Sequence, residues 1–209
     1  MEMKVQPKDY SQWGEQELIT KFFGGFIGRF LDLGASDGVT GSNTRGLFDL
    51  GWSGVCVEAS PFAFQKLIEN YRGADRVECV CAAVMGSCGI TSIDDSDDQT
   101  ATCATHPDQS IVKRHYGIGC ATPGQISVRY GVFDFVSFDL EGVDLGVIQA
   151  SDYLLRGARL VCFEDAMPYR AFDKAYHGAI LEALARMGFR RIIGTTTDAS
   201  KSGNTLVAR

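Results

Sequence analysis

The sequence lacks the features that would assign it to a nucleic-acid-binding or membrane-spanning class. Its 20 Lys and Arg residues never form a run longer than a pair, and the 209-residue chain carries a net charge of −6. Proteins that grip nucleic acid non-specifically usually present a basic face, so nucleic-acid substrates are disfavoured. The apolar run Phe22–Ile27 is short and broken by Gly24 and Gly25, so it cannot span a bilayer.

The sequence also has few of the patterns that are typical of disulfide frameworks, zinc sites or secretory signal peptides. The seven cysteines are odd in number and include no Cys-x-x-Cys. Cys56 and Cys162 lie in apolar, strand-like runs, where a thiol behaves as a small hydrophobe. Cys79 and Cys81 have no second pair at a distance suited to zinc. No basic segment followed by an apolar one begins the chain. We therefore expect a cytoplasmic protein with free thiols.

The glycine fingerprint of dinucleotide-binding folds is also missing. Residues Phe30–Gly38 have the pattern of a strand that ends in a tight, glycine-framed turn carrying an acid. The fingerprint Gly-x-Gly-x-x-Gly, begun at Gly34, would need glycines where Ser36 and Val39 stand, which argues against an NAD-dependent oxidoreductase. Ser42–Thr44 can open a helix, and such a strand–turn–helix junction presents free N–H groups to a ligand.

Strand-like and helix-like patterns alternate along the chain. This alternation predicts an α/β fold, a Rossmann-like doubly wound sheet that is mostly parallel, with helices on both faces. A short polar turn joins the last two strands, which should therefore pair antiparallel. The length favours one domain over residues 1–209, beginning with a helical segment over 1–28. The expected strands are 30–33, 54–58, 77–84, 133–139, 159–164, 189–195 and 204–208, and the expected helices are 10–23, 42–50, 61–71, 145–155 and 173–187.

The stretch 86–130 breaks this alternation, and an unstructured loop of such length is unusual and often functional. We expect either a solvated insertion or a lid over the active site that selects the acceptor. His106 or His115 could act there as a base near neutral pH, or serve as an ordinary polar loop residue. The acidic residues of 94–98 lack the glycine and distal glutamate of an EF-hand loop, so they give little support to a Ca²⁺ site.

A set of motifs in fixed order carries a resemblance to one family. The spacing Asp-x-Gly-Ala-x-x-Gly of residues 32–38 resembles the cofactor loop of methyltransferases that use S-adenosylmethionine (SAM). The full set looks like the FkbM family of these enzymes: Ser11–Glu15, Asp32–Gly38, Ser42–Thr44, Gly51–Gly54 with Glu58, and Asp134–Gly142. The resemblance implies a Rossmann-like fold and methyl transfer from SAM to the hydroxyl oxygen of a small molecule, sugar or glycan.

The resemblance places the cofactor beyond the ends of the first two strands. Asp32 could accept a hydrogen bond from the methionyl ammonium, and Glu58 could accept both ribose hydroxyls. Gly34 and Gly38 allow the backbone to approach the cofactor closely. The expected cofactor-binding residues are Asp32, Gly34, Ala35, Ser36, Gly38, Ser42, Asn43, Thr44, Glu58 and Ala59.

Acids at the ends of the fourth and fifth strands are the candidates for chemistry. In one arrangement Asp139 or Glu141 is the general base and Glu164 orients the acceptor. In another, a divalent cation is held by Asp139, Glu164 and Asp165, as in catechol-type methyltransferases. The metal-free arrangement is favoured. The plainer alternative is that these acids cap the helices that follow.

Other residues near these strands have weaker assignments. Tyr169, Arg170 and Phe172 could line an acceptor pocket, whereas His177 is expected to be structural. The roles of Gln12 and Glu15 are not readable from the sequence. A catalytically silent module that keeps only the nucleoside pocket is the principal alternative to an enzyme. The pattern identifies neither the acceptor nor the oligomeric state.

Overall fold

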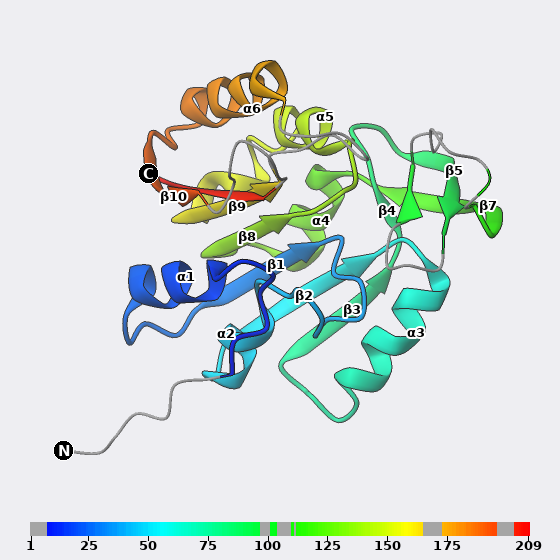
Figure 1. Cartoon of the computed structure of the whole chain (residues 1–209), viewed down its shortest axis with the longest axis horizontal. Coiled ribbons are helices and arrows are strands. Elements are labelled where there is room, and N and C mark those ends of the chain that lie inside the picture. Colours follow the sequence, from blue (N-terminus) through cyan, green and yellow to red (C-terminus); the bar gives the residue numbers. More distant parts are fainter. Residues whose placement is uncertain (1–7, 97–100, 104–109, 111, 165–172, 196–202) are drawn as a thin grey trace.

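One mixed sheet of seven strands organises the computed structural model, which describes residues 8–96, 101–103, 110, 112–164, 173–195 and 203–209 (Figure 1). In spatial order its strands are β10 (Arg191–Thr195), β11 (Asn204–Ala208), β9 (Leu160–Glu164), β8 (Phe135–Phe138), β1 (Arg29–Leu33), β2 (Ser53–Glu58) and β3 (Val77–Cys81). β11 is antiparallel to both neighbours, and the other pairings are parallel. The predicted fold class is therefore confirmed.

Helices cover both faces of this sheet because its central strands are apolar on both sides. Leu31 and Leu33 of β1 pack in one core cluster, and Phe30, which precedes them, packs in the other. The first cluster includes residues of α4 (Pro123–Tyr130), α5 (Asp144–Gln149) and α6 (Lys174–Arg186). The second includes residues of α1 (Glu15–Phe23), α2 (Arg45–Asp49) and α3 (Pro61–Asn70) (Figure 1).

The stretch 86–130, expected to be a solvated insertion or a lid without regular structure, contains three of the four strands of a second sheet, so the absence of regular structure was wrongly expected. This sheet has four strands in the order β4 (Ala83–Val84), β7 (Arg114–Ala121), β5 (Gly89–Asp95) and β6 (Ala101–Thr102) within the described part of the chain. Half-buried and exposed residues alternate along most of β7, so one of its faces is largely wet. A strand with so little apolar surface gives a weak sequence signal.

Several element boundaries also differ from the predictions. The first helix begins at Glu15 rather than near residue 10, because Gly14 before it is left-handed at φ +89°. The strand expected over 77–84 is two strands, and the second of them joins the small sheet. The helix expected over 145–155 ends at Gln149 and is followed by a 3₁₀ turn, η1 (Leu154–Gly157).

Two further expectations concern the surface and the thiols. No helix in the described ranges is long and apolar enough to cross a membrane. All seven cysteines lie in the described part of the chain, and none of them forms a disulfide.

Candidate active site

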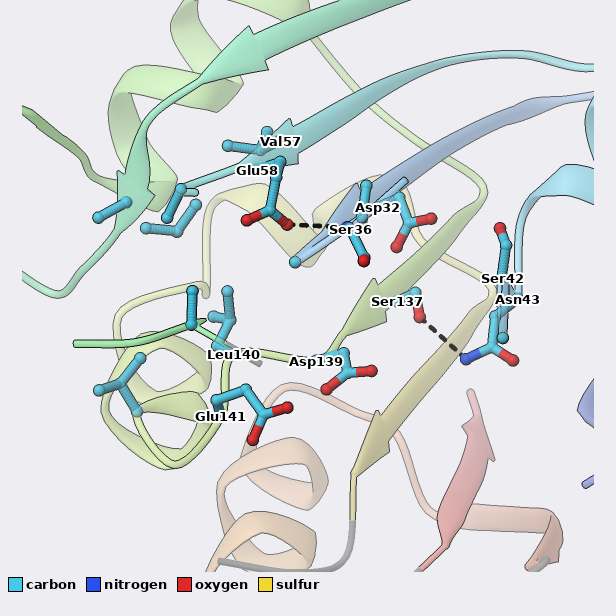
Figure 2. A pocket seen from close by; sticks show the side chains of 18 of the residues that line it. Asp32, Ser36, Ser42, Asn43, Val57, Glu58, Ser137, Asp139, Leu140 and Glu141 are labelled. Carbon is cyan, nitrogen blue, oxygen red and sulfur yellow. Dashed lines mark hydrogen bonds between the residues drawn. The ribbon is translucent and has the colours of Figure 1, made fainter. Parts of the chain in front are cut away.

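A polar cavity opens at the carboxyl ends of β1, β2 and β8 (Figure 2). β1 lies between β2 and β8, so the chain connections diverge on either side of it, which is where doubly wound sheets bind ligands. Ala83 and Val84 of β4 also line the cavity, as do Ala101 and Cys103 of the small sheet and its flank. Ten of the predicted site residues line it: Asp32, Gly34, Ala35, Ser36, Ser42, Asn43, Glu58, Ala59, Asp139 and Glu141.

The turn after β1 brings three strand ends together. The N–H groups of Gly34 and Ala35 both donate to the carbonyl oxygen of Val57 on β2, at 2.9 and 3.0 Å. Gly34 has φ +86°, and a Cβ at this position would collide with the carbonyl oxygen of Asp139 after β8. Glycine is therefore required at this point for the β1 turn to lie against the end of β8.

The carboxylate of Glu58 is held by two backbone donors. Its Oε2 accepts from the N–H of Ser36 at 2.8 Å (Figure 2). Its Oε1 accepts from the N–H of Ser60 at 2.7 Å. Burial raises the pKa of Glu58, and these N–H groups oppose the rise because they stabilise the ionised form. Each oxygen keeps further acceptor capacity, so the carboxylate can also receive hydroxyl donors from a ligand.

Asp32 is buried at the end of β1 and is fixed from α2. The hydroxyl of Thr44 donates to its Oδ2 at 2.6 Å. Burial raises the pKa of Asp32 to about 6, and the Thr44 hydrogen bond opposes that rise. Ser42 orders the turn that leads into α2, since its Oγ accepts from the N–H groups of Thr44 at 3.2 Å and Arg45 at 3.0 Å.

Two buried polar atoms at the cavity have no hydrogen-bond partner within the described residues. They are the hydroxyl oxygen of Ser36 and Oδ1 of Asn43, whose Nδ2 donates to the hydroxyl of Ser137 at 3.3 Å (Figure 2). Unpaired buried polar atoms are rare in native proteins because they have lost hydration without compensation. A polar ligand with donors for these atoms would fit the cavity.

Asp139 and Glu141 lie across the cavity from Glu58 and Ser36 (Figure 2). Burial, followed by the charge of Glu141, raises the pKa of Asp139 well above its ordinary value. Burial and the charge of Asp144 raise the pKa of Glu141 to about 7. A carboxyl group of this kind can hold or release a proton near neutral pH.

Three predicted site residues do not line the cavity. A Cβ on Gly38 would press against Leu67 of α3 and against Tyr71, which follows that helix, so this glycine serves packing. Thr44 acts on Asp32 rather than on the open space. Glu164 ends β9, where its register partner is Asn204 of β11.

Other predicted residues lie elsewhere. Within the described part of the chain, no group of three or more His, Cys, Asp or Glu side chains is placed to hold a metal ion. The Nδ1 of His115 lies 2.7 Å from Oδ1 of Asp94 on the small sheet. The ring of His177 lies 5.7 Å from that of Phe163. Asp165, His106, Tyr169, Arg170 and Phe172 lie outside the described residues.

Gln12 lines the cavity, although its role could not be read from the sequence. Its side chain packs over Gly41, and the neighbouring Ser11 forms a β-bridge with the same glycine. Glu15 anchors this segment, since its Oε2 accepts from the N–H of Trp13 at 2.9 Å and its Oε1 accepts from Asn204 Nδ2 at 2.9 Å. The only sequence signal was the membership of Gln12 in the N-terminal motif.

Comparison with known proteins agrees with this geometry. The sequence matches the family described as "Methyltransferase FkbM domain" over residues 32–191. No curated protein matches the sequence. Many solved structures share the fold, at identities too low to establish more than the fold.

Three of these structures illustrate the range of similarity. A ribosomal protein L11 methylase from Lactobacillus delbrueckii subsp. bulgaricus has a TM-score of 0.56 at 14% identity, over 93% of this chain and 76% of that one. The N-terminal domain of EvdMO1 with SAH bound has a TM-score of 0.54 at 15% identity, over 96% and 83%. Methyltransferase FkbM from Methylobacillus flagellatus KT has a TM-score of 0.53 at 14% identity, over 86% and 43%, so this chain spans less than half of that protein.

Proposed function

The chain belongs to the FkbM family of SAM-dependent methyltransferases, and from this premise we propose that it methylates a hydroxyl oxygen of a small molecule, sugar or glycan. The observation that carries the proposal is the cavity itself. Asp32 and Glu58 lie on one side of it, and on the other side lies Glu141, whose raised pKa of about 7 is compatible with proton transfer.

The cofactor side of the cavity is assigned to residues of β1, β2 and the loop before α2. Glu58 accepts the ribose hydroxyls, because both of its oxygens are already aimed by backbone donors. Asp32 faces the methionyl ammonium, whose charge would favour the ionised carboxylate. Oδ1 of Asn43 and the hydroxyl of Ser36 take up further polar groups of the cofactor, which would satisfy two otherwise unpaired atoms.

The chemical side is assigned to the loop after β8. SAM supplies an electrophilic methyl group on a sulfonium. A sugar or alcohol hydroxyl is a poor nucleophile, so a base beside it helps. We assign that role to Glu141: its ionised carboxylate would take the proton of the acceptor hydroxyl as the bond from that oxygen to the methyl carbon forms and the bond from the methyl carbon to the sulfonium sulfur breaks. Asp139 beside it orients the acceptor. Glu164, which lies outside the cavity lining, has no role in this proposal.

The pocket charge supports this choice of ligands. Its lining includes four acids, namely Asp32, Glu58, Asp139 and Glu141, and no Lys, Arg or His among the described residues. Such a site favours a cofactor that carries a sulfonium and an ammonium, and an acceptor that is neutral and donates hydrogen bonds.

The test combines binding with transfer. We expect calorimetry to detect SAM binding by the whole protein, and methyl-labelled SAM to give a product whose new methyl signal in NMR is that of an O-methyl ether. The acceptor panel would comprise neutral polyols, sugars and glycans, with carboxylated and phosphorylated versions as matched controls. Binding without transfer to any hydroxyl would favour a catalytically silent binding module, and no SAM binding would overturn the cofactor assignment.

A further inference from the structure

The loop after β8 holds Glu141 in an unusual backbone conformation. Glu141 and Ser36, both at φ +50°, are the non-glycine residues with positive φ among those described. This region is sparsely populated by residues with a side chain, so the surroundings must enforce it. Both residues line the cavity, which places the strain at the candidate site.

Asp144 fixes the backbone N–H groups of the residues before and after Glu141. Its Oδ1 accepts from the N–H of Leu140 at 3.0 Å, and its Oδ2 accepts from the N–H of Gly142 at 3.2 Å. Asp144 is fully buried. One carboxylate therefore bridges the residues before and after Glu141.

The carbonyl of Glu141 is held from the other sheet. The hydroxyl of Thr102 on β6 donates to it at 3.0 Å, and Thr102 is almost fully buried. β6 pairs with β5, where Asp95 accepts a hydrogen bond from Ser60 at 2.8 Å. Ser60 is the residue whose N–H holds Glu58. The small sheet thus reaches both sides of the cavity.

We propose that Thr102 and Asp144 are positioning residues that keep the Glu141 carboxylate turned into the cavity. Without them the backbone of Glu141 relaxes toward negative φ, and the Cα–Cβ bond turns to a new direction. The small sheet is then a fixed part of the active site rather than a lid. This inference rests on the proposed function, because it matters for turnover only if Glu141 serves as the base.

The central test removes the hydrogen bond from Thr102 to the carbonyl of Glu141 while the shape of the side chain is kept. Thr102→Val replaces the hydroxyl by a methyl group, and Thr102→Ser keeps the hydroxyl. We expect Thr102→Val to lower kcat about tenfold, since small misplacement of a catalytic group is costly. The Kd for SAM should stay within about twofold, because Glu58 and Asp32 are untouched, and Thr102→Ser should restore most of the lost rate. Thr91→Val on the neighbouring β5 is the matched control and should leave kcat unchanged.

A structural readout makes the result independent of the acceptor. In a crystal structure of Thr102→Val with SAH, we expect Glu141 at negative φ with its carboxylate displaced. Retention of φ near +50° and of the side-chain position would overturn the inference. So would equal kcat values for Thr102→Val and wild type.

Glu141→Gln separates this inference from the function on which it rests. If Glu141→Gln turns over normally, the base assignment fails and the positioning role fails with it. If Glu141→Gln is inactive while Thr102→Val matches wild type, only the positioning role is lost.

Discussion

The two acidic walls of the cavity are built in opposite ways. On the β2 side, Glu58 receives backbone N–H donors on both oxygens, and these offset part of the effect of burial on its pKa. On the β8 side, the carboxylates of Asp139 and Glu141 accept no hydrogen bond from the described residues, and neighbouring acids add to the effect of burial. Backbone donors therefore offset part of the cost of a buried charge at Glu58, whereas neighbouring acids add to that cost at Asp139 and Glu141.

This difference separates binding from chemistry within one cavity. A carboxylate fixed by backbone donors has its orientation set before a ligand arrives, and these donors favour its ionised form. A carboxyl group crowded by other acids titrates closer to neutral pH and can accept a proton during a reaction. Substitutions on the two walls should consequently affect different kinetic constants.

The largest expected effect is that of Glu141→Gln. The amide keeps the shape of the side chain but cannot take a proton, so kcat should fall by about 100-fold or more, the usual range for loss of a general base. The Kd for SAM should change less than about twofold, because the wall that binds it is intact. Steady-state kinetics and calorimetry would check both values. A large loss of SAM affinity with unchanged kcat would reverse the roles of the two walls.

Glu58→Gln should produce the opposite pattern. The neutral amide loses the charge that Ser36 and Ser60 stabilise, and a hydrogen bond to a charged group contributes about 1.5–3 kcal/mol, so the Kd for SAM should rise roughly tenfold to 100-fold. At saturating SAM, kcat should remain close to wild type. Glu78→Gln on the adjacent β3 is the control, since Glu78 is half exposed and pairs with Arg129 at the surface. Equal effects of Glu58→Gln and Glu78→Gln would contradict the assignment.

Asp32 tests the same comparison through folding stability. Burial raises its pKa from 3.8 to about 6, so the folded state favours the neutral form of this side chain. The contribution of the neutral Asp32 to the free energy of unfolding is complete below pH 3.8 and is lost as the pH rises through 6. The total loss is about 2–3 kcal/mol.

Asp32→Asn should therefore be more stable than wild type at pH 8, and the difference should shrink toward pH 4. The amide oxygen can still accept from Thr44, while SAM binding should weaken. Urea denaturation at both pH values would measure this, with the exposed Asp152→Asn as control. A difference that does not vary with pH would argue against a buried, titrating Asp32.

The parts of the fold that could be predicted from the sequence are those whose strands are clearly apolar. The strand ends at Asp32, Glu58 and Asp139 could be located because apolar strands mark them and parallel topology brings them together. The small sheet could not, because its strands have a wet face and little apolar patterning. That the whole chain is one domain stays a prediction.

The roles of Thr102 and Gln12 could not be predicted from the sequence, for a related reason. Each lies on a segment whose path depends on long-range pairing: Thr102 donates to the carbonyl of Glu141, and Ser11, next to Gln12, bridges to Gly41. Local propensity carries no information about such contacts. Strain at Glu141 was equally hidden, since a positive φ at a glutamate is imposed by its partners and not by its own residue type.

The smallest expected effect is that of substituting Gln12, which lies at the edge of the cavity on the side assigned to the cofactor. This exposed side chain lies over Gly41, next to the loop that carries Ser42 and Asn43, so its amide can contact only the outer part of a bound cofactor. Gln12→Ala should raise the Kd for SAM about threefold, the loss expected for one neutral hydrogen bond, without lowering kcat. Gln65→Ala on the exposed side of α3 is the matched control. If Gln12→Ala instead lowers kcat at constant Kd, the N-terminal segment acts on the acceptor, as Asp139 and Glu141 are proposed to do.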